Sequence, residues 1–388
     1  MNHRSLMTAV AAVGALLVTL VPGTASAAPE QAPVRACADG AALHCYAMYR
    51  STGAQGLRVS APPAGFGPAE LREAYKLPAT GGAGQTIAIV DAYDNPSAEA
   101  DLAVYRKQFG LPECSTANGC FRKVNQRGDA TPLPKPDSGW GVEIALDLDM
   151  ASAACPQCKL LLVEGDDPSF AGLAQSVDTA VKLGASVVSN SYGADEFNGM
   201  DTYAGSYKHP GVPILASSGD AGFQPASFPA VLTSVISVGG TSLTRSAGAR
   251  GWSETAWSGA GSGCSAWVAK PAWQHDPNCR LRTSSDVSAV ADPKTGLAVY
   301  DTYGLGQRAG WLVVGGTSAS SPFVAGVLAL AGHGKQINDA SFLYTRADKL
   351  FDVVGGSNGF CGEDYLCTGL PGYDAPTGLG TPDGIGAF

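Results

Sequence analysis

The sequence predicts an α/β protein built on a mostly parallel β-sheet with helices on both faces. Short apolar runs rich in β-branched residues alternate with helical patterns along the chain, as in successive strand–helix–strand units. The strand candidates are nearly continuous apolar runs, which is typical of parallel strands covered on both faces. Polar residues stand just past several strand candidates, at Asp91, Ser191, Asp220 and Ser318. Ligand sites in such sheets lie at the carboxyl ends of the strands.

The first elements can be justified one by one. A helix is expected over 68–75, because proline stands in its first turn, where an N–H is not needed. A β-branched run between glycine and aspartate predicts a buried strand over 86–90. A helix over 98–109 follows. Residues 111–139 are rich in glycine, proline and polar residues, so we expect a loop there.

The later elements continue the alternation. We interpret the segment 143–154 as an amphipathic helix that is largely buried, because apolar residues surround its acids. The remaining expected elements are a strand over 159–163, a helix over 170–183, strands over 186–189, 213–217 and 235–238, and a strand over 311–314 that leads into an apolar helix.

Composition limits the classes of function. The chain has 388 residues, enough for one large or two modest domains, and its 45% hydrophobic content supports a substantial core. The formal net charge is −9, and the lysines and arginines do not cluster, so we expect no nucleic-acid partner. The sequence has no internal repeat or heptad run.

The first 27 residues have the pattern of a secretory signal peptide. His3 and Arg4 precede the apolar run 9–21, and small residues lead to a cleavage site after Ala27. A membrane anchor is the alternative, although the run is short for a span. We expect a secreted, extracellular protein that has no membrane contact after the signal is removed. Residues 28–62 would then be an N-terminal arm or a short prosegment.

The ten cysteines fall into close couples: Cys37/Cys45, Cys114/Cys120, Cys155/Cys158, Cys264/Cys279 and Cys361/Cys367. An even number of cysteines at short spacings in a secreted chain favours disulfides. The couple Cys155/Cys158 is also compatible with a redox or zinc pair, but a zinc site would require further ligands nearby. We expect five small disulfide loops.

The stretch from Gly315 to Pro322 points to a nucleophile. Two glycines allow a tight backbone approach after the strand, and small hydroxyl residues then begin a long apolar helix. The positive end of the helix dipole would favour an alkoxide or an oxyanion at Ser318, which is where a nucleophile belongs. The alternative is an ordinary capping serine.

A serine nucleophile needs a base, and histidine is the usual one. The five histidines do not stand where a triad base would. His333, for example, follows Ser318 by about four helical turns, roughly 20 Å along the axis. We therefore disfavour a histidine-dependent serine peptidase.

Two carboxylates can take the place of the histidine. Glu143 and Asp147 stand at i and i+4 of the expected helix, so they share one face with β-carbons about 5–6 Å apart. Two acids this close among apolar neighbours raise the pKa of at least one of them. The alternative is a solvated acidic face. Asp149 is a spare candidate, but it points elsewhere on the helix.

Two further aspartates follow strands. Asp220 lies between glycines after the strand at 213–217, which suits either a turn or a protonated acid that donates a hydrogen bond to an oxyanion. Asp91 follows the strand at 86–90, and we assign it a structural role because no histidine is available to pair with it.

The ordered motifs resemble those of the sedolisins, serine-carboxyl peptidases with a subtilisin-like fold. The resemblance runs from about residue 66 to the C-terminus. It rests on the segments 84–90, 191–193, 217–220, 228–230, 238–241, 254–257, 286–292, 315–322 and 377–382, together with the Glu143/Asp147 pair. It implies that residues 63–388 form one sedolisin-like peptidase domain.

The resemblance also implies roles for individual residues. Ser318 is implied to be the nucleophile, Glu143 its general base, Asp147 the partner that orients Glu143, and Asp220 the acid that stabilises the oxyanion. The segment Ser191-Tyr192-Gly193 is implied to pair with the backbone of the substrate as an added strand.

One structural calcium ion, Ca2+, is a further implication. The family binds it near the C-terminus, and the matching positions here are Asp352 and Asp374 by side chain and Val353, Leu370 and Gly372 by backbone carbonyl. Ligation by oxygen alone suits calcium. Leu370 stands where the family has glycine.

Taken together, the sequence predicts a secreted, acid-acting, monomeric serine endopeptidase whose partners are protein or peptide substrates. Protonation of part of the carboxyl cluster would favour activity in acid. A tripeptidyl exopeptidase of the same fold and an inactive binding module with this fold are the alternatives.

Overall fold

The central sheet contains eight strands, and neighbours run parallel except for β12. We describe a computed structural model, which covers residue 1 and residues 32–38, 42–50, 63–304 and 310–388; the expected signal peptide lies outside these residues. In sheet order the strands are β12 (Trp252–Ala256), β11 (Val235–Arg245), β9 (Ile214–Ser217), β7 (Val187–Asn190), β4 (Thr86–Ala92), β6 (Lys159–Gly165) and β5 (Phe121–Asn125), and β15 (Val287–Val290) also pairs with β11.

The helices are α1 (Pro68–Ala74), α2 (Ala98–Gln108), α3 (Ser138–Ala154), α4 (Phe170–Lys182), α5 (Asp201–Ala204), α6 (Thr317–Ala331) and α7 (Ser341–Tyr344). They cover both faces of the sheet, which confirms the predicted fold class. Because side chains alternate along a strand, Ile87 and Ile89 of β4 join the core on the α3 and α6 side, whereas Ala88 and Val90 join the core on the α4 side.

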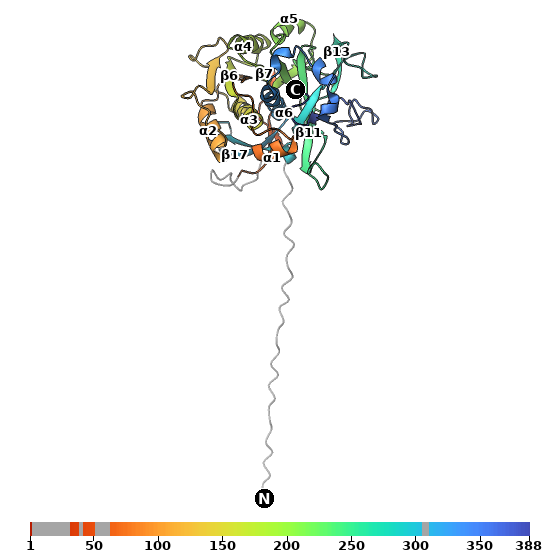
Figure 1. Ribbon diagram of the computed structural model, residues 1–388, viewed down its shortest axis with the longest axis horizontal. Coiled ribbons are helices and arrows are strands. Elements are labelled where there is room, and N and C mark those ends of the chain that lie inside the picture. The colour runs from red at the N-terminus through yellow and green to blue at the C-terminus, as the bar shows by residue number, and fades with distance from the viewer. Residues whose placement is uncertain (2–31, 39–41, 51–62, 305–309) are drawn as a thin grey trace. The chain divides into compact units, whose positions relative to one another are not determined.

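Helices α3 and α6 pack against each other and lie side by side in Figure 1. Gly326 of α6 permits this close approach, since a Cβ there would lie 2.5 Å from the Cβ of Ala154. The helix predicted at 143–154 is present and buried as expected, but it is longer and is not amphipathic. Helix α3 starts at Ser138, where the side chain of Asp137 caps it, and it is buried continuously from Trp140 to Ala154, because α2, α6 and the sheet cover it.

The predicted loop 111–139 contains β5, which pairs with β6 at the edge of the central sheet. Sequence reasoning missed this strand because Arg122 and Lys123 interrupt its apolar pattern. Asp91 lies inside β4 rather than past its end. The strand expected at 311–314 is β17 (Gly310–Gly315), but it belongs to a separate antiparallel sheet.

The smaller sheets connect distant parts of the chain. One has the order β1 (Val34–Arg35), β3 (Met48–Tyr49), β17 and β16 (Leu297–Asp301), and another has the order β10 (Ser227–Phe228), β8 (Tyr192–Asp195) and β2 (His44–Cys45). The remaining pairs are β13 (Gly263–Ala269) with β14 (Leu281–Ser284), and β18 (Leu350–Phe351) with β19 (Thr381–Pro382). Short strands from the segment 28–62 are therefore part of two sheets.

All five expected disulfides are present, each within its predicted couple. Each joins cysteines between 3 and 15 residues apart, so they close local loops and do not join distant elements. Within the part of the chain that is described, the helices are too short or too polar to cross a bilayer.

Candidate active site

Ser318 lies in the first turn of α6, next to the end of β7. Gly316 precedes the helix with a φ of 100°, a left-handed conformation that favours glycine. The hydroxyl of Ser318 donates a hydrogen bond of 3.3 Å to the backbone oxygen of Ser191. The side chain of Ser318 is fully buried, so solvent does not reach it in this arrangement.

Three buried carboxyl groups meet beside Ser318. Glu143 and Asp147 project from the same face of α3, and Asp91 comes from β4, where the alternation that turns Ile87 and Ile89 toward α3 also turns Asp91. All three side chains are fully buried. Sequence reasoning missed the place of Asp91 in this cluster, although the period of the strand was the available signal.

Burial and mutual repulsion set the protonation of the cluster. Burial raises the pKa of Glu143 and of Asp147 well above the ordinary range, and the nearby charge of Asp91 raises both further. The nearby hydroxyl of Ser318 and the hydrogen bond from the N–H of Ala47 to Oε2 act in the opposite direction on the pKa of Glu143. Burial raises the pKa of Asp91 to about 8. The cluster therefore retains protons at neutral pH.

The side chain of Asp147 is held by a hydrogen bond from Ser191. Its Oδ1 accepts a hydrogen bond of 2.9 Å from the hydroxyl of Ser191, and Asp147 shares one face of α3 with Glu143. Asp147 thus links that face of α3 to the end of β7. Such an arrangement can orient Glu143 and share a proton with it.

Asp220 follows β9 on the other side of Ser318. Burial raises its pKa to about 7, so the carboxyl is protonated in acid. Its Oδ2 has no hydrogen-bond partner among the described residues. This oxygen lies close to the backbone of Gly316, since a Cβ added to that glycine would be only 2.7 Å from it. A protonated Asp220 can therefore donate a hydrogen bond toward the start of α6.

The segment Ser191-Tyr192-Gly193 passes from β7 into β8. Its backbone pairs with another strand, and Cys45 lies opposite Tyr192 and His44 opposite Gly193 in antiparallel register. The side chain of Tyr192 points into the core, where its hydroxyl donates to Asn190 Oδ1 at 2.8 Å. The backbone of this segment is thus the part available for pairing.

The surroundings of four histidines can be described. His209 forms a 3.0 Å ion pair with Asp178, and His333 follows the far end of α6. His275 borders a hollow with Tyr344 and Tyr373. The ring of His44 lies edge-on to that of Tyr46 at 5.1 Å.

The five expected calcium ligands lie on two segments, 352–353 and 370–374, which a hydrogen bond joins. Asp352 Oδ2 accepts from the N–H of Gly372 at 3.0 Å, and Asp374 Oδ2 accepts from the N–H of Leu370 at 3.2 Å. Burial, with a further contribution from Asp352, raises the pKa of Asp374 to about 8. Within the described residues, the carbonyl oxygens of Val353, Leu370 and Gly372 accept no hydrogen bond.

A cation would relieve the repulsion between the two carboxylates, so the donor set fits calcium. Only two of the five ligands are carboxylates. No cluster of three or more His, Cys, Asp or Glu side chains suited to a metal occurs among the residues the structure describes.

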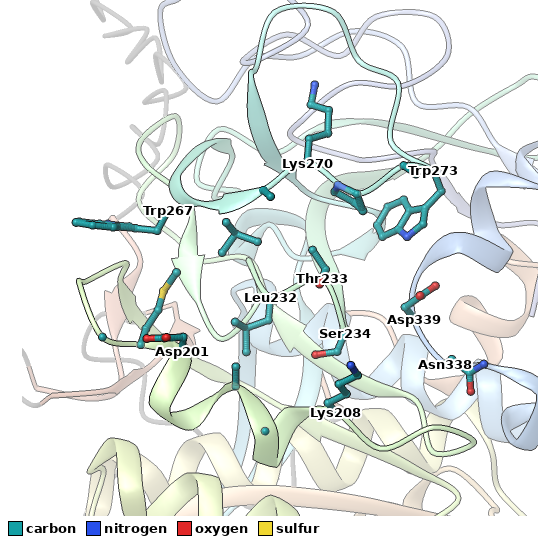
Figure 2. Close-up of a pocket in the computed structure, with 18 of the residues that line it drawn as sticks. Asp201, Lys208, Leu232, Thr233, Ser234, Trp267, Lys270, Trp273, Asn338 and Asp339 are labelled. Atoms are coloured by element: carbon teal, nitrogen blue, oxygen red, sulfur yellow. The ribbon is translucent and has the colours of Figure 1, made fainter.

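A separate hollow of about 880 Å³ lies between the α5 region and β13. Figure 2 shows Trp267 and Trp273 on opposite sides of it, with Lys270 above and Lys208 below. None of the residues around Ser318 lines this hollow, so it is distinct from the carboxyl cluster.

Comparison with known proteins shows that the chain is similar to subtilases. The subtilase family model matches residues 140–343, a range that contains Glu143, Asp147, Asp220 and Ser318. The chain is 30% identical over 368 residues to kumamolisin of Bacillus sp. (strain MN-32), which covers 84% of this chain and 63% of that protein. It is 27% identical over 364 residues to sedolisin of Pseudomonas sp. (strain 101), covering 82% and 60%.

The chain thus spans about three fifths of the length of these relatives. Among solved structures, Pseudomonas sedolisin complexed with two molecules of pseudo-iodotyrostatin matches with a TM-score of 0.70 and 24% identity, over 83% of this chain and 96% of that one. Sphericase matches with a TM-score of 0.54 and 19% identity, over 84% and 99%. At these identities the structures show that the fold is shared, and this agrees with the predicted subtilisin-like architecture.

Proposed function

Because this chain belongs to the sedolisin family, within the subtilases, we propose that it is a secreted serine endopeptidase that works in acid. Ser318 is the nucleophile and forms an acyl-enzyme with the carbonyl side of the cleaved bond. One observation carries this proposal. The hydroxyl of Ser318, the Glu143–Asp147 pair and the unpartnered oxygen of Asp220 all meet at one point, the start of α6.

Proton transfer is assigned to carboxyl groups. Glu143 takes the proton of Ser318 as the hydroxyl attacks, and it returns that proton to the leaving amine. Asp147 orients Glu143 and shares its proton. Burial raises the pKa values of both acids, which brings them nearer to the pKa values of the serine hydroxyl and the leaving amine.

Asp220 is assigned the oxyanion. Its proton on Oδ2 would stabilise the negative charge on the carbonyl oxygen as the tetrahedral intermediate forms. Since its pKa is about 7, this donor is lost as the pH rises through neutrality. The enzyme should therefore be active in acid, where Asp220 keeps its proton, and should lose activity as the pH rises through neutrality.

The endopeptidase mode is supported by a segment of the chain itself. Residues 44–49 contain two short strands beside the site, and the carbonyl nearest Gly316 is that of Tyr46. The chain continues before the three residues that end at this carbonyl, to Leu43, whose N–H donates to the Pro168 oxygen at 3.1 Å. A tripeptidyl exopeptidase would need a block at this point.

The proposed calcium ion would be held by Asp352, Asp374 and the carbonyl oxygens of Val353, Leu370 and Gly372. It supplies positive charge that stabilises the loop and takes no part in the reaction. Five disulfides suit an oxidising compartment, which supports secretion.

The test is a peptide-library digest at about pH 4 and about pH 8 with the parent chain, Ser318→Ala and Glu143→Gln. We expect internal cleavage by the parent at the lower pH and none by Ser318→Ala. Removal of tripeptides alone would favour the exopeptidase. If the parent cleaves no peptide at either pH, and if Ser318→Ala keeps the biological effect of the parent, the result would favour a binding module.

A further inference from the structure

The hollow between the α5 region and β13 lies at the opposite edge of the central sheet from Ser318. Pro210 and Ser234 line it and lie just before β9 and β11, two strands that run parallel. Asn338 also lines it and follows α6, whereas Ser318 is in the first turn of that helix, which is about 22 Å long. The hollow is therefore separate from the proposed peptidase cleft.

The hollow has the size and the aromatic lining of a ligand site. Its volume of about 880 Å³ falls within the range of about 300–1,000 Å³ that is usual for such sites. Trp267 and Trp273 lie on opposite sides of it (Figure 2). The Trp273 ring packs on Tyr344 at 4.6 Å, but Trp267 is 53% exposed. A ligand that covers Trp267 would remove a large apolar surface from water.

Most polar side chains around the hollow are not used by the fold. Figure 2 shows Thr233 and Ser234 between Asp201 on one side and Asn338 on the other. Within the part of the chain that is described, six lining side chains take part in no hydrogen bond or ion pair: Asn198, Asp201, Lys208, Thr233, Ser234 and Asn338. Amides and hydroxyls predominate in this set, so the lining offers both hydrogen-bond donors and acceptors.

The charged side chains of the lining are of both signs. Lys270 is engaged by Asp276, whose Oδ2 lies 2.9 Å from its Nζ. Lys208 remains, together with Asp201 and Asp339. Neither an anion nor a cation would find a uniform field here, so the lining favours a ligand that is polar and neutral.

Strand β13 is not free to pair with a peptide beside the hollow. The N–H of Ala266 donates to Glu196 Oε1 at 2.9 Å. The N–H groups of Trp267 and Val268 donate to the Oγ of Ser265 at 3.0 Å and 2.7 Å. Three consecutive donors are thus occupied by side chains, and strand addition requires such donors. This favours a ligand that has no peptide backbone.

We propose that this hollow is a binding site for a neutral oligosaccharide. One face of a pyranose ring presents C–H groups, which the electron-rich face of the Trp267 indole attracts. The sugar hydroxyls both donate and accept hydrogen bonds, as do the amides of Asn198 and Asn338 and the hydroxyls of Thr233 and Ser234. The site would hold the protein on a polysaccharide or on the glycan of a glycoprotein, and it does not depend on the proposed peptidase function.

The first test measures binding by the full chain as Ser318→Ala, which cannot digest itself or its ligand. Cellohexaose, chitohexaose, and ribonuclease B with and without its mannose-rich glycan are titrated calorimetrically at about pH 4. Saturable binding of a free hexasaccharide would support the inference with a polysaccharide as the source. Binding of ribonuclease B that is lost with its glycan would support it with a glycoprotein as the source. Failure of all these probes would overturn the inference and leave the proposed peptidase function standing.

The second test assigns the binding to the hollow. Trp267→Ala in the same background should weaken sugar binding about tenfold, near the upper worth of one aromatic contact. Phe360→Ala is the matched control, since Phe360 is 96% exposed and does not line the hollow. Equal affinities of Trp267→Ala and the control would overturn the inference.

Two further measurements distinguish this site from a peptide site. Trp267→Ala with an intact Ser318 should cleave a short peptide with the kcat/KM of the parent, because the hollow is remote from the carboxyl cluster. A matching loss of peptide cleavage would show that the hollow is part of the peptidase cleft. Binding of unglycosylated casein peptides that disappears in Trp267→Ala, with no sugar bound, would assign the hollow to peptides. Either result would overturn the inference.

Discussion

Asp220 Oδ1 accepts two hydrogen bonds from Thr317, one from its N–H and one from its hydroxyl, each 2.8 Å long. Both donors lie on the residue that precedes Ser318. They fix the orientation of the carboxyl group, and any proton it carries must be on Oδ2. In the proposed mechanism, the oxyanion contact from Asp220 therefore requires a proton on Oδ2.

Asp220→Asn provides the direct test of this role. An amide donates a hydrogen bond at every pH, so the fall in kcat near pH 7 in the parent should move to higher pH in the variant. Asp220→Ala has no donor and should lose about 10²–10³ in kcat, as expected for an oxyanion contact. A kcat–pH profile measured with one peptide distinguishes these outcomes, and an alkaline limb that stays in place in Asp220→Asn would contradict the assignment.

Glu143→Gln should reduce kcat by at least about 10²-fold, because the amide cannot accept the proton of Ser318. The variant has nearly the same shape, so its Tm should not fall. Glu73→Gln is the matched control, since Glu73 is exposed and forms an ion pair with Arg245 at 3.4 Å. Comparable activity in the two variants would show that another group serves as base.

Asp91→Asn should leave the acidic limb of the kcat–pH profile in place and should change the profile only toward pH 8. Asp91 has a pKa of about 8, so it is neutral in acid and raises the pKa of Glu143 and of Asp147 only once it ionises. The amide cannot ionise and keeps the shape. Both carboxyl oxygens of Asp91 lack a partner among the described residues, so no hydrogen bond is lost. With Asp129→Asn as the exposed control, a shifted acidic limb would contradict a neutral Asp91, and a profile unchanged near pH 8 would reduce Asp91 to a packing role.

Stability should be greatest in acid. Burial raises the pKa of Asp91 to about 8 and that of Asp220 to about 7, whereas in the unfolded chain both groups ionise near pH 4. A raised folded pKa gives stability that is fully present below the unfolded pKa and is lost as pH rises through the folded one. Thermal unfolding of Ser318→Ala, which cannot digest itself, should show Tm falling between about pH 5 and pH 9. A Tm that rises over this range would show that these carboxyls are not buried as described.

Removal of calcium by a chelator should lower Tm, and added calcium should restore it. Without the ion, the buried Asp374 and its neighbour Asp352 repel each other and the loop is destabilised. Asp352→Asn should abolish the effect of the chelator, whereas Asp348→Asn, an exposed control nearby, should keep it. A parent Tm that does not respond to the chelator would rule out the site.

Local pattern was enough to predict much of the site. The spacing of Glu143 and Asp147, the glycines before Ser318 and the turn at Asp220 are visible within a few residues of sequence. The contribution of Asp91 required knowing which face of β4 meets α3, and the strand period contained that information.

The short N-terminal strands β2 and β3 could not be predicted in the same way. Both are two residues long, and their partners β8 and β17 lie more than 100 residues away in sequence. Such pairings leave no periodic signal, because their register is set by contacts formed only in the folded chain. Strand β5 was missed for the related reason that it lies at an edge, where charged residues are tolerated.

The contact between Gly326 and Ala154 has a consequence for heat inactivation. The proposed nucleophile and the proposed base lie on α6 and α3, two helices in close contact, and neither residue lies on a loop that could unfold first. Catalytic capacity and cooperative structure should therefore disappear in one transition on heating, with no cooler range in which the enzyme is folded yet inert.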